Sequence, residues 1–234
     1  GCFFWNWNRK VGISFFRPSH HPTVTIACLR WNVMRGLVNK QIYNGDGDKK
    51  LELIFDSERV LYHGTTNLFA DHIRKNGIKI YPRKFGADFG HGFYMTMGNE
   101  NQALKWATIK SKNVGIPDKQ LLEDMKMTVR DYISIAKELK PAIIKLKIKD
   151  IKTWESLNYR MFFSDDNQWK KFVFQNRNAP FFQHNWDWIF GPVADGGLSK
   201  PSYLSIKAYP DMNQLSVHSK KAVDCLEILE VISL

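Results

Sequence analysis

Two stretches of the chain decide the expected fold: Leu61-Tyr62-His63-Gly64-Thr65-Thr66 and Asp88-Phe89-Gly90-His91-Gly92-Phe93-Tyr94-Met95-Thr96. In the first, strand character over residues 51–55 and 60–62 is broken by the turn-like residues that begin at His63. We therefore expect His63-Gly64 at the end of a strand. In the second, a loop with several glycines precedes a strand over residues 93–96.

The segments around these two stretches predict an α+β fold. Apolar residues at helical spacing predict helices over residues 67–75 (stopped by Gly77), 99–112, 121–139 and 169–176. Isoleucine and leucine alternating with lysine predict a half-buried strand over 142–148. Further strand candidates are 188–190, 203–206, 215–218 and 226–232. Late strands separated by few helices indicate the α+β class rather than a parallel α/β sheet.

The first 58 residues differ in composition from the rest. Residues 1–45 contain no Asp or Glu but several Lys, Arg and Trp, and a turn-like run follows at residues 44–48. We therefore divide the chain into a basic, aromatic N-terminal segment, 1–58, and a larger domain, 59–234. The segment either stacks on and neutralises nucleic acid, or is an ordinary subdomain over the sheet or an expression artefact.

The composition limits the classes of binding partner and the cellular compartment to be expected. The net charge of +11 attracts polyanions such as nucleic acid or a nucleotide, although it also serves solubility. The three cysteines lie far apart and the histidines lack ligand spacing, which argues against a disulfide framework or a metal site. The cysteine pattern fits a reducing compartment, so we expect a cytoplasmic protein. No apolar run is long enough for a membrane span.

The two stretches, with Gln102-Ala103-Leu104-Lys105-Trp106-Ala107 after them, resemble ADP-ribosyltransferases of the His-Tyr-Glu type, the branch of diphtheria toxin and the poly(ADP-ribose) polymerases. They are most similar to a group of bacterial, largely uncharacterised members with the form Asp-Phe-Gly-x-Gly-Phe-Tyr. The resemblance implies a split, strongly twisted two-sheet core with flanking helices and an NAD cleft, with residues 59–234 as the catalytic domain.

The resemblance also implies roles for individual residues. His63 would bond a ribose hydroxyl, Gly64 would hold the nicotinamide carboxamide through its backbone, and Tyr94 would stack on the nicotinamide ring. Other residues expected to bind NAD are Thr65, Gly92 and Phe93. Taken singly, His63 is more often a turn residue and Tyr94 more often core, but their order and spacing favour a cleft.

The third motif of the family departs from its pattern. A Glu at the head of a late strand is expected, whereas Asn213-Gln214-Leu215-Ser216-Val217-His218 carries Gln214. An amide can bond the ribose but offsets developing positive charge less well, and losing such a contact can cost about a hundredfold in rate. Either a second acid assists, with Asp187, Asp195 and Asp88 as candidates, or turnover is slow.

Two more residues near the motifs have competing interpretations. Arg177 either grips the NAD pyrophosphate or forms a surface ion pair with Asp187. Trp106 is expected to be core packing.

The expected function is mono-ADP-ribosylation of a macromolecule by a bacterial toxin or defence factor. Nucleic acid (RNA or DNA) is the favoured acceptor, protein is nearly as plausible, and an antitoxin is a plausible partner. NAD hydrolysis, a catalytically silent NAD-binding module and a plain nucleic-acid binder are the alternatives.

Overall fold

The computed structural model describes residues 40–41, 58–81, 87–179, 183–195 and 202–234. Over these ranges the chain has a mixed α+β fold, as predicted, with seven helices and seven strands in one sheet of order β5-β6-β7-β3-β2-β4-β8. The two-residue strand β1 (Lys40–Gln41) pairs in parallel with β5. The strands are β2 (Leu61–Thr66), β3 (Phe93–Met97), β4 (Pro141–Ile148), β5 (Tyr159–Met161), β6 (Trp188–Ala194), β7 (Ala208–Val217) and β8 (Leu226–Ser233).

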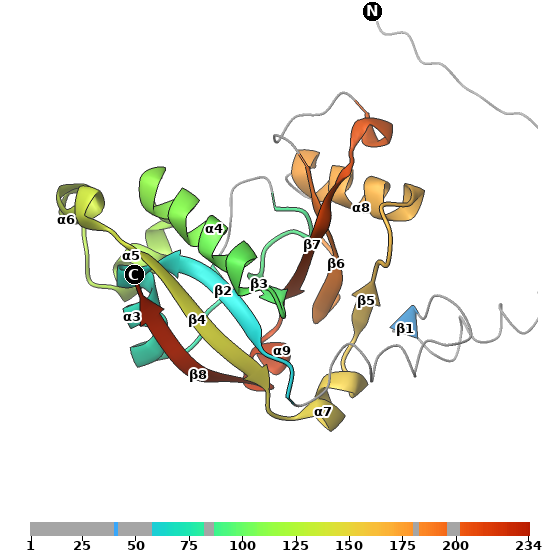
Figure 1. Ribbon diagram of the computed structural model, residues 1–234, viewed down its shortest axis with the longest axis horizontal. Coiled ribbons are helices and arrows are strands. Elements are labelled where there is room, and N and C mark those ends of the chain that lie inside the picture. Colours follow the sequence, from blue (N-terminus) through green and yellow to red (C-terminus); the bar gives the residue numbers. More distant parts are fainter. Residues whose placement is uncertain (1–39, 42–57, 82–86, 180–182, 196–201) are drawn as a thin grey trace, which may run out of the picture. The chain divides into compact units, whose positions relative to one another are not determined.

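The weakest junction in this sheet lies between β2 and β3. These antiparallel strands pair at only two positions, Leu61 with Met97 and Tyr62 with Thr96. Beyond that point β2 stays paired with β4 along its whole length, while β3 pairs with β7. Figure 1 shows β2, β4 and β8 curving away from β5, β6 and β7 on the two sides of this junction.

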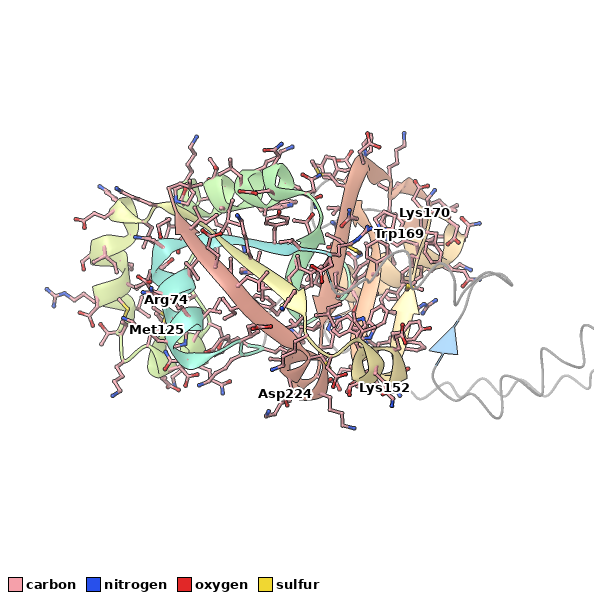
Figure 2. The ribbon with its side chains drawn as sticks, turned by 60° about the horizontal axis from the view of Figure 1, so that its bottom comes forward. Arg74, Met125, Lys152, Trp169, Lys170 and Asp224 are labelled. Atoms are coloured by element: carbon pink, nitrogen blue, oxygen red, sulfur yellow. The ribbon has the colours of Figure 1, made fainter. Side chains whose placement is uncertain are left out.

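The helices flank the sheet and include those predicted over residues 67–75, 99–112 and 169–176. They are α3 (Asn67–Asn76), α4 (Glu100–Lys112), α5 (Lys119–Asp124), α6 (Val129–Ile135), α7 (Ile151–Ser156), α8 (Asn167–Asn178) and α9 (Lys220–Asp224). Helix α3 ends at Gly77, whose φ of 77° suits glycine. Charged side chains such as Arg74 and Asp224 lie on the outer surface (Figure 2). No helix among the described residues combines the length and hydropathy needed to cross a bilayer.

Three sequence predictions are wrong in detail. His63 and Gly64 lie inside β2 rather than at its end, because both pair with β4. The helix expected over 121–139 is two short helices, since Lys126 adopts a φ of 54° between them and Thr128 starts α6 with a capping box. Residues 203–205 form a 3₁₀ turn rather than a strand. The expected strand over 51–55 and the segment 1–58, except its last residue and β1, lie outside the described residues.

The core continues across the β2–β3 junction. Apolar side chains from both sides of it, including Leu61, Phe93 and Leu215, form one buried cluster. Trp188 is sandwiched between Trp154 and Tyr159, with ring centroids 4.8 and 4.4 Å away. A second cluster around Phe89 and Trp169 holds α8 against β6. Buried apolar side chains therefore stabilise the sheet on each side of the β2–β3 junction.

Gly64 permits the close approach of α4 to β2. A Cβ atom built on Gly64 would lie 2.0 Å from the carbonyl oxygen of Ala103, a backbone atom that cannot swing away. We therefore expect Gly64→Ala to push α4 off the strand and to cost at least the roughly 1–3 kcal/mol typical of overpacking.

Thermal unfolding measures this cost, as a fall in Tm of about 2–4 °C per kcal/mol for a chain of this size. Gly115→Ala is the matched control, because a Cβ there meets nothing within 4 Å. Equal Tm values for the two variants would contradict the close packing of α4 on Gly64.

Candidate functional site

Two cavities open where β2 and β3 separate. The smaller, about 340 Å³, is lined by Gly64, Tyr94 and Gln214 among others. The larger, about 860 Å³, is lined by His63, Thr65 and Phe93 among others. Neighbouring residues of a strand point to opposite faces, so His63 and Gly64 serve different cavities, as do Phe93 and Tyr94. Lys110 of α4 lines both cavities, which are therefore adjacent.

The ring of Tyr94 is fixed by the loop that precedes its own strand. Its hydroxyl donates to the Gly90 carbonyl at 2.7 Å and accepts the Phe89 N–H at 3.0 Å. Phe89 itself is completely buried. The hydroxyl therefore orders the loop, and the partly exposed ring lines the smaller cavity.

His63 bridges the gap between the separating strands. Its Nδ1 lies 2.6 Å from the carbonyl oxygen of Tyr94, and its ring stacks on Phe93 with centroids 4.1 Å apart. A carbonyl can only accept, so Nδ1 carries the hydrogen and Nε2 is the acceptor of the neutral ring. The side chain is 6% exposed, on the side of the larger cavity.

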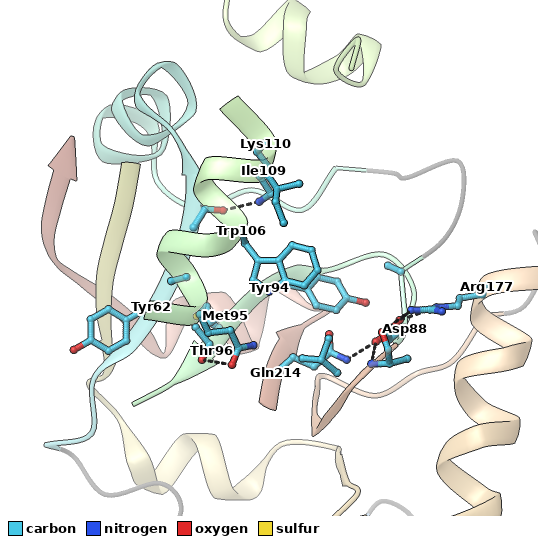
Figure 3. A pocket seen from close by; sticks show the side chains of 16 residues that line it. Tyr62, Asp88, Tyr94, Met95, Thr96, Trp106, Ile109, Lys110, Arg177 and Gln214 are labelled. Carbon is cyan, nitrogen blue, oxygen red and sulfur yellow. Dashed lines mark hydrogen bonds and ion pairs between the residues drawn. The ribbon is translucent and has the colours of Figure 1, made fainter. Parts of the chain in front are cut away.

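Gln214 belongs to a buried polar network that holds Asp88 and Arg177 as well (Figure 3). Its Nε2 donates to Asp88 Oδ2 at 2.7 Å and to the Pro192 carbonyl at 2.9 Å. Arg177 donates to Asp88 Oδ1 from Nε at 2.8 Å, with Nη2 at 2.6 Å from the same oxygen. Of the three acids considered as helpers of Gln214, Asp88 is the one in contact with it.

The other two candidate acids lie elsewhere. Asp187 accepts the backbone N–H of Asn158 and lines a separate hollow beside Cys225. Asp195 is exposed at the end of β6. The expected Arg177–Asp187 surface pair is wrong: Arg177 is buried, with its side chain 7% exposed, and its ion pair is with Asp88.

The backbone of Gly64 faces the smaller cavity with its carbonyl already bonded. Lys110 Nζ donates to that oxygen at 2.6 Å (Figure 3). Gly92, expected to bind NAD, also packs closely, because a Cβ there would lie 2.8 Å from the His218 ring. It also lines the larger cavity, as does Thr65.

The prediction that Trp106 is core packing is wrong. Its side chain is 36% exposed and lines the smaller cavity beside Ile109. Lys110 is the residue that sequence analysis missed, and Asp88 was named only as one of three candidate acids. The i, i+4 spacing of Trp106 and Lys110 on one helix face was the available signal for Lys110, whereas a contact between residues 88 and 214 leaves no trace in local spacing.

A second histidine network lies behind Tyr94. His218 Nδ1 donates to the His91 carbonyl at 2.5 Å, and Ser216 Oγ therefore donates to His218 Nε2 at 2.8 Å. Ser216 is fully buried, so this Ser–His pair is structural. Burial, helped by the neighbouring His184, lowers the pKa of His218 to about 3.

This histidine predicts loss of stability in acid. Below pH 6.5 His218 becomes protonated in the unfolded chain, whereas in the folded chain it stays neutral until about pH 3. The unfolding free energy should therefore fall as pH drops from 6.5 towards 3, by at most about 1.4 kcal/mol per pH unit from this group.

Denaturant unfolding at several pH values measures this slope. His218→Asn, which keeps a donor for the His91 carbonyl, should show a shallower slope than the parent. Lys112→Met, at an exposed residue that is not among the causes of the His218 pKa shift, should keep the parental slope. Parallel slopes for parent and His218→Asn would show that His218 titrates normally.

Comparison with known proteins shows a family for the chain but names no activity. Neither the curated proteins nor the solved structures contain a match to the chain. A protein-family model matches residues 59–202, which is more than half of the chain and includes β2, β3, α4 and β6. The chain therefore belongs to the family described as "Protein of unknown function (DUF3990)".

Proposed function

We propose that the chain transfers ADP-ribose from NAD to a macromolecular acceptor. The observation that carries the proposal is the pair of adjacent cavities at the β2–β3 junction, with Tyr94 and Gln214 in one and His63 in the other. The order of these three residues resembles the His-Tyr-Glu ADP-ribosyltransferases. The separation of β2 from β3 supports the finer assignment of a split two-sheet core with an NAD cleft.

The smaller cavity suits the nicotinamide riboside half of NAD. Its volume of about 340 Å³ is at the low end for ligand sites. Tyr94 and Trp106 offer aromatic surface to a planar ring. Gln214 offers an amide to the ribose hydroxyls. Because Arg177 is ion-paired with Asp88, this proposal gives it a structural role rather than a role as a pyrophosphate ligand.

The larger cavity suits the ADP half. Lys79, Lys110 and Lys119 line it, but Lys79 and Lys119 are paired with Asp124 and Glu123. Lys110 is therefore the cation that this proposal assigns to the diphosphate. Phe69, Phe93 and Tyr81 add aromatic surface for a base. His63 stands between this cavity and Tyr94, where a ribose hydroxyl could meet its Nε2.

Lys110 has two roles in this proposal. Its ammonium group donates a hydrogen bond to the Gly64 carbonyl. The resemblance gives this backbone group the role of binding the nicotinamide carboxamide. Binding of NAD exchanges these partners: the carboxamide N–H takes the carbonyl, and the ammonium turns to the diphosphate between the two cavities.

The reaction breaks one bond and forms one. The bond between ribose C1′ and nicotinamide N1 breaks, and its electron pair leaves on the nicotinamide. The acceptor's nucleophile donates a lone pair to C1′ and loses its proton to solvent. Positive charge develops on the ribose at the transition state, where the Gln214 carbonyl oxygen would be the nearest polar atom of the third motif.

Nucleic acid is the favoured acceptor. The net charge of +11 steers polyanions to the chain, and the exposed Trp106 at the smaller cavity offers a surface on which a base can stack. Protein, or water in an NAD hydrolase, are the other acceptors. A toxin or defence enzyme of this kind would be neutralised by an antitoxin protein.

A silent binding module is the rival from another class. Gln214, a neutral amide where the family has a glutamate, favours it. Such a module would bind NAD without releasing nicotinamide.

Labelled NAD tests the function directly. We expect the full chain, incubated with NAD labelled in the ADP-ribose and a bacterial extract, to leave label on the nucleic-acid fraction and to release nicotinamide. His63→Ala and Tyr94→Ala should abolish both signals.

His91→Ala, at an exposed histidine near Tyr94 in sequence, is the control for folding and should keep activity. Label on the protein fraction would change the acceptor, and free ADP-ribose alone would identify a hydrolase. No nicotinamide release in any fraction, with NAD bound, would leave the silent module as the function.

The two-cavity proposal makes a separate prediction for Lys110. Replacing it by Met removes one charge-assisted hydrogen bond to the diphosphate, worth about 1.5–3 kcal/mol. The KM for NAD should rise about tenfold or more at low salt, with a smaller effect on kcat, and the salt dependence of KM should weaken.

Lys112→Met is the matched control, because Lys112 is exposed on the same helix and lines neither cavity. A KM for Lys110→Met equal to that of this control would exclude Lys110 from the NAD site.

A further inference from the structure

The orientation of the Gln214 amide is fixed by its partners. Both hydrogens of Nε2 are used, one on Asp88 Oδ2 at 2.7 Å and one on the Pro192 carbonyl at 2.9 Å. Both partners are acceptors, so the amide nitrogen must face them. The carbonyl oxygen of the amide is then the group that Gln214 offers to the smaller cavity, which it lines (Figure 3).

Asp88 is held as firmly as Gln214. Oδ2 also accepts the Ala194 N–H at 2.8 Å, and Oδ1 accepts Arg177. The side chains of Asp88 and Arg177 are each 7% exposed. The Asp88 carboxylate is therefore ion-paired with Arg177 through one oxygen and accepts hydrogen bonds from two neutral donors through the other. These interactions make the network rigid.

We infer that Asp88 is a positioning residue, which turns the carbonyl oxygen of Gln214 towards the sugar and away from the protein. The inference rests on the proposed function and deepens it: the pair Asp88–Gln214 stands in place of the glutamate of the third motif. The dipole of the amide, fixed by Asp88, presents its negative end to a ribose hydroxyl. Asp88 acts through Gln214 and does not itself touch the substrate.

The same geometry explains why a glutamine occupies position 214. A glutamate there would set two carboxylates about one hydrogen-bond length apart, in a buried site with one arginine among its described residues. Like charges so close cannot both ionise, so the pair would share a proton. The protonated form of such a glutamate would donate to Asp88 and keep its carbonyl oxygen on the cavity, as the amide of Gln214 does.

Two variants of the full chain test the inference. In Asp88→Asn, the new amide nitrogen faces the Arg177 donors if it replaces Oδ1, or both the Ala194 N–H and Gln214 Nε2 if it replaces Oδ2. Both arrangements set donor against donor, so the Gln214 amide is either loosened or reversed. We expect kcat for nicotinamide release from NAD to fall about tenfold to a hundredfold, with KM within about threefold of the parent. Asp195→Asn, at an exposed acid, should change neither.

The stability and kcat of Gln214→Glu, each compared with the parent at the same pH, should depend on pH. The shared proton has a folded pKa above the roughly 4.3 of unfolded glutamate, so the variant is stabilised at low pH and loses this as pH rises through the raised value. The titratable or charged groups that line the cavity around it are Asp88, Arg177, Lys110, Tyr62 and Tyr94. Its Tm deficit against the parent should grow from pH 5 to pH 8, and its kcat should fall over the same range.

The outcomes separate the inference from the function. A folded Asp88→Asn with parental kcat, or a Tm deficit of Gln214→Glu that is flat with pH, would overturn the positioning role. A parent that releases no nicotinamide would overturn the proposed function instead. In that case the pH dependence of Tm, which needs no activity, still decides whether Asp88 orients the side chain at 214.

Discussion

The site depends on one constraint, which is that β2 and β3 pair at only two positions before each follows a different neighbour. Main-chain groups that a continuous sheet would pair are left at the gap, and buried polar groups need partners. The His63 imidazole supplies one for the Tyr94 carbonyl, and Lys110 supplies one for Gly64. The side chains that close the gap are therefore the ones that line the two cavities.

Helix α4 and the loop before β3 form the walls of the site at the gap between β2 and β3. The helix can lie on β2 because Gly64 has no side chain and Ala103 and Ala107 are small. The loop is tied down by the Tyr94 hydroxyl at one point and by Asp88 at another. A buried ion pair such as Asp88–Arg177 adds little net stability, so its value lies in the geometry that it imposes on its neighbours.

Much of the fold and part of the site could be predicted from the sequence. Period and turn residues indicated the α+β class and the helix ending at Gly77, because these are set locally. The break at Lys126 and the 3₁₀ turn at 203–205 depend on a single residue's φ and on tertiary packing, which periodicity does not record. Contacts such as Asp88 with Gln214 join residues far apart in the chain, so local patterns could not supply them.

In the proposed function the two cavities hold one dinucleotide across the β2–β3 gap. A crystal structure of the full chain with a non-hydrolysable carbocyclic analogue of NAD is the decisive experiment. It should show the nicotinamide beside Tyr94, a ribose hydroxyl on the carbonyl oxygen of Gln214, the diphosphate at Lys110 and the adenosine in the larger cavity. An analogue bound elsewhere, or no binding at millimolar concentration, would contradict this arrangement.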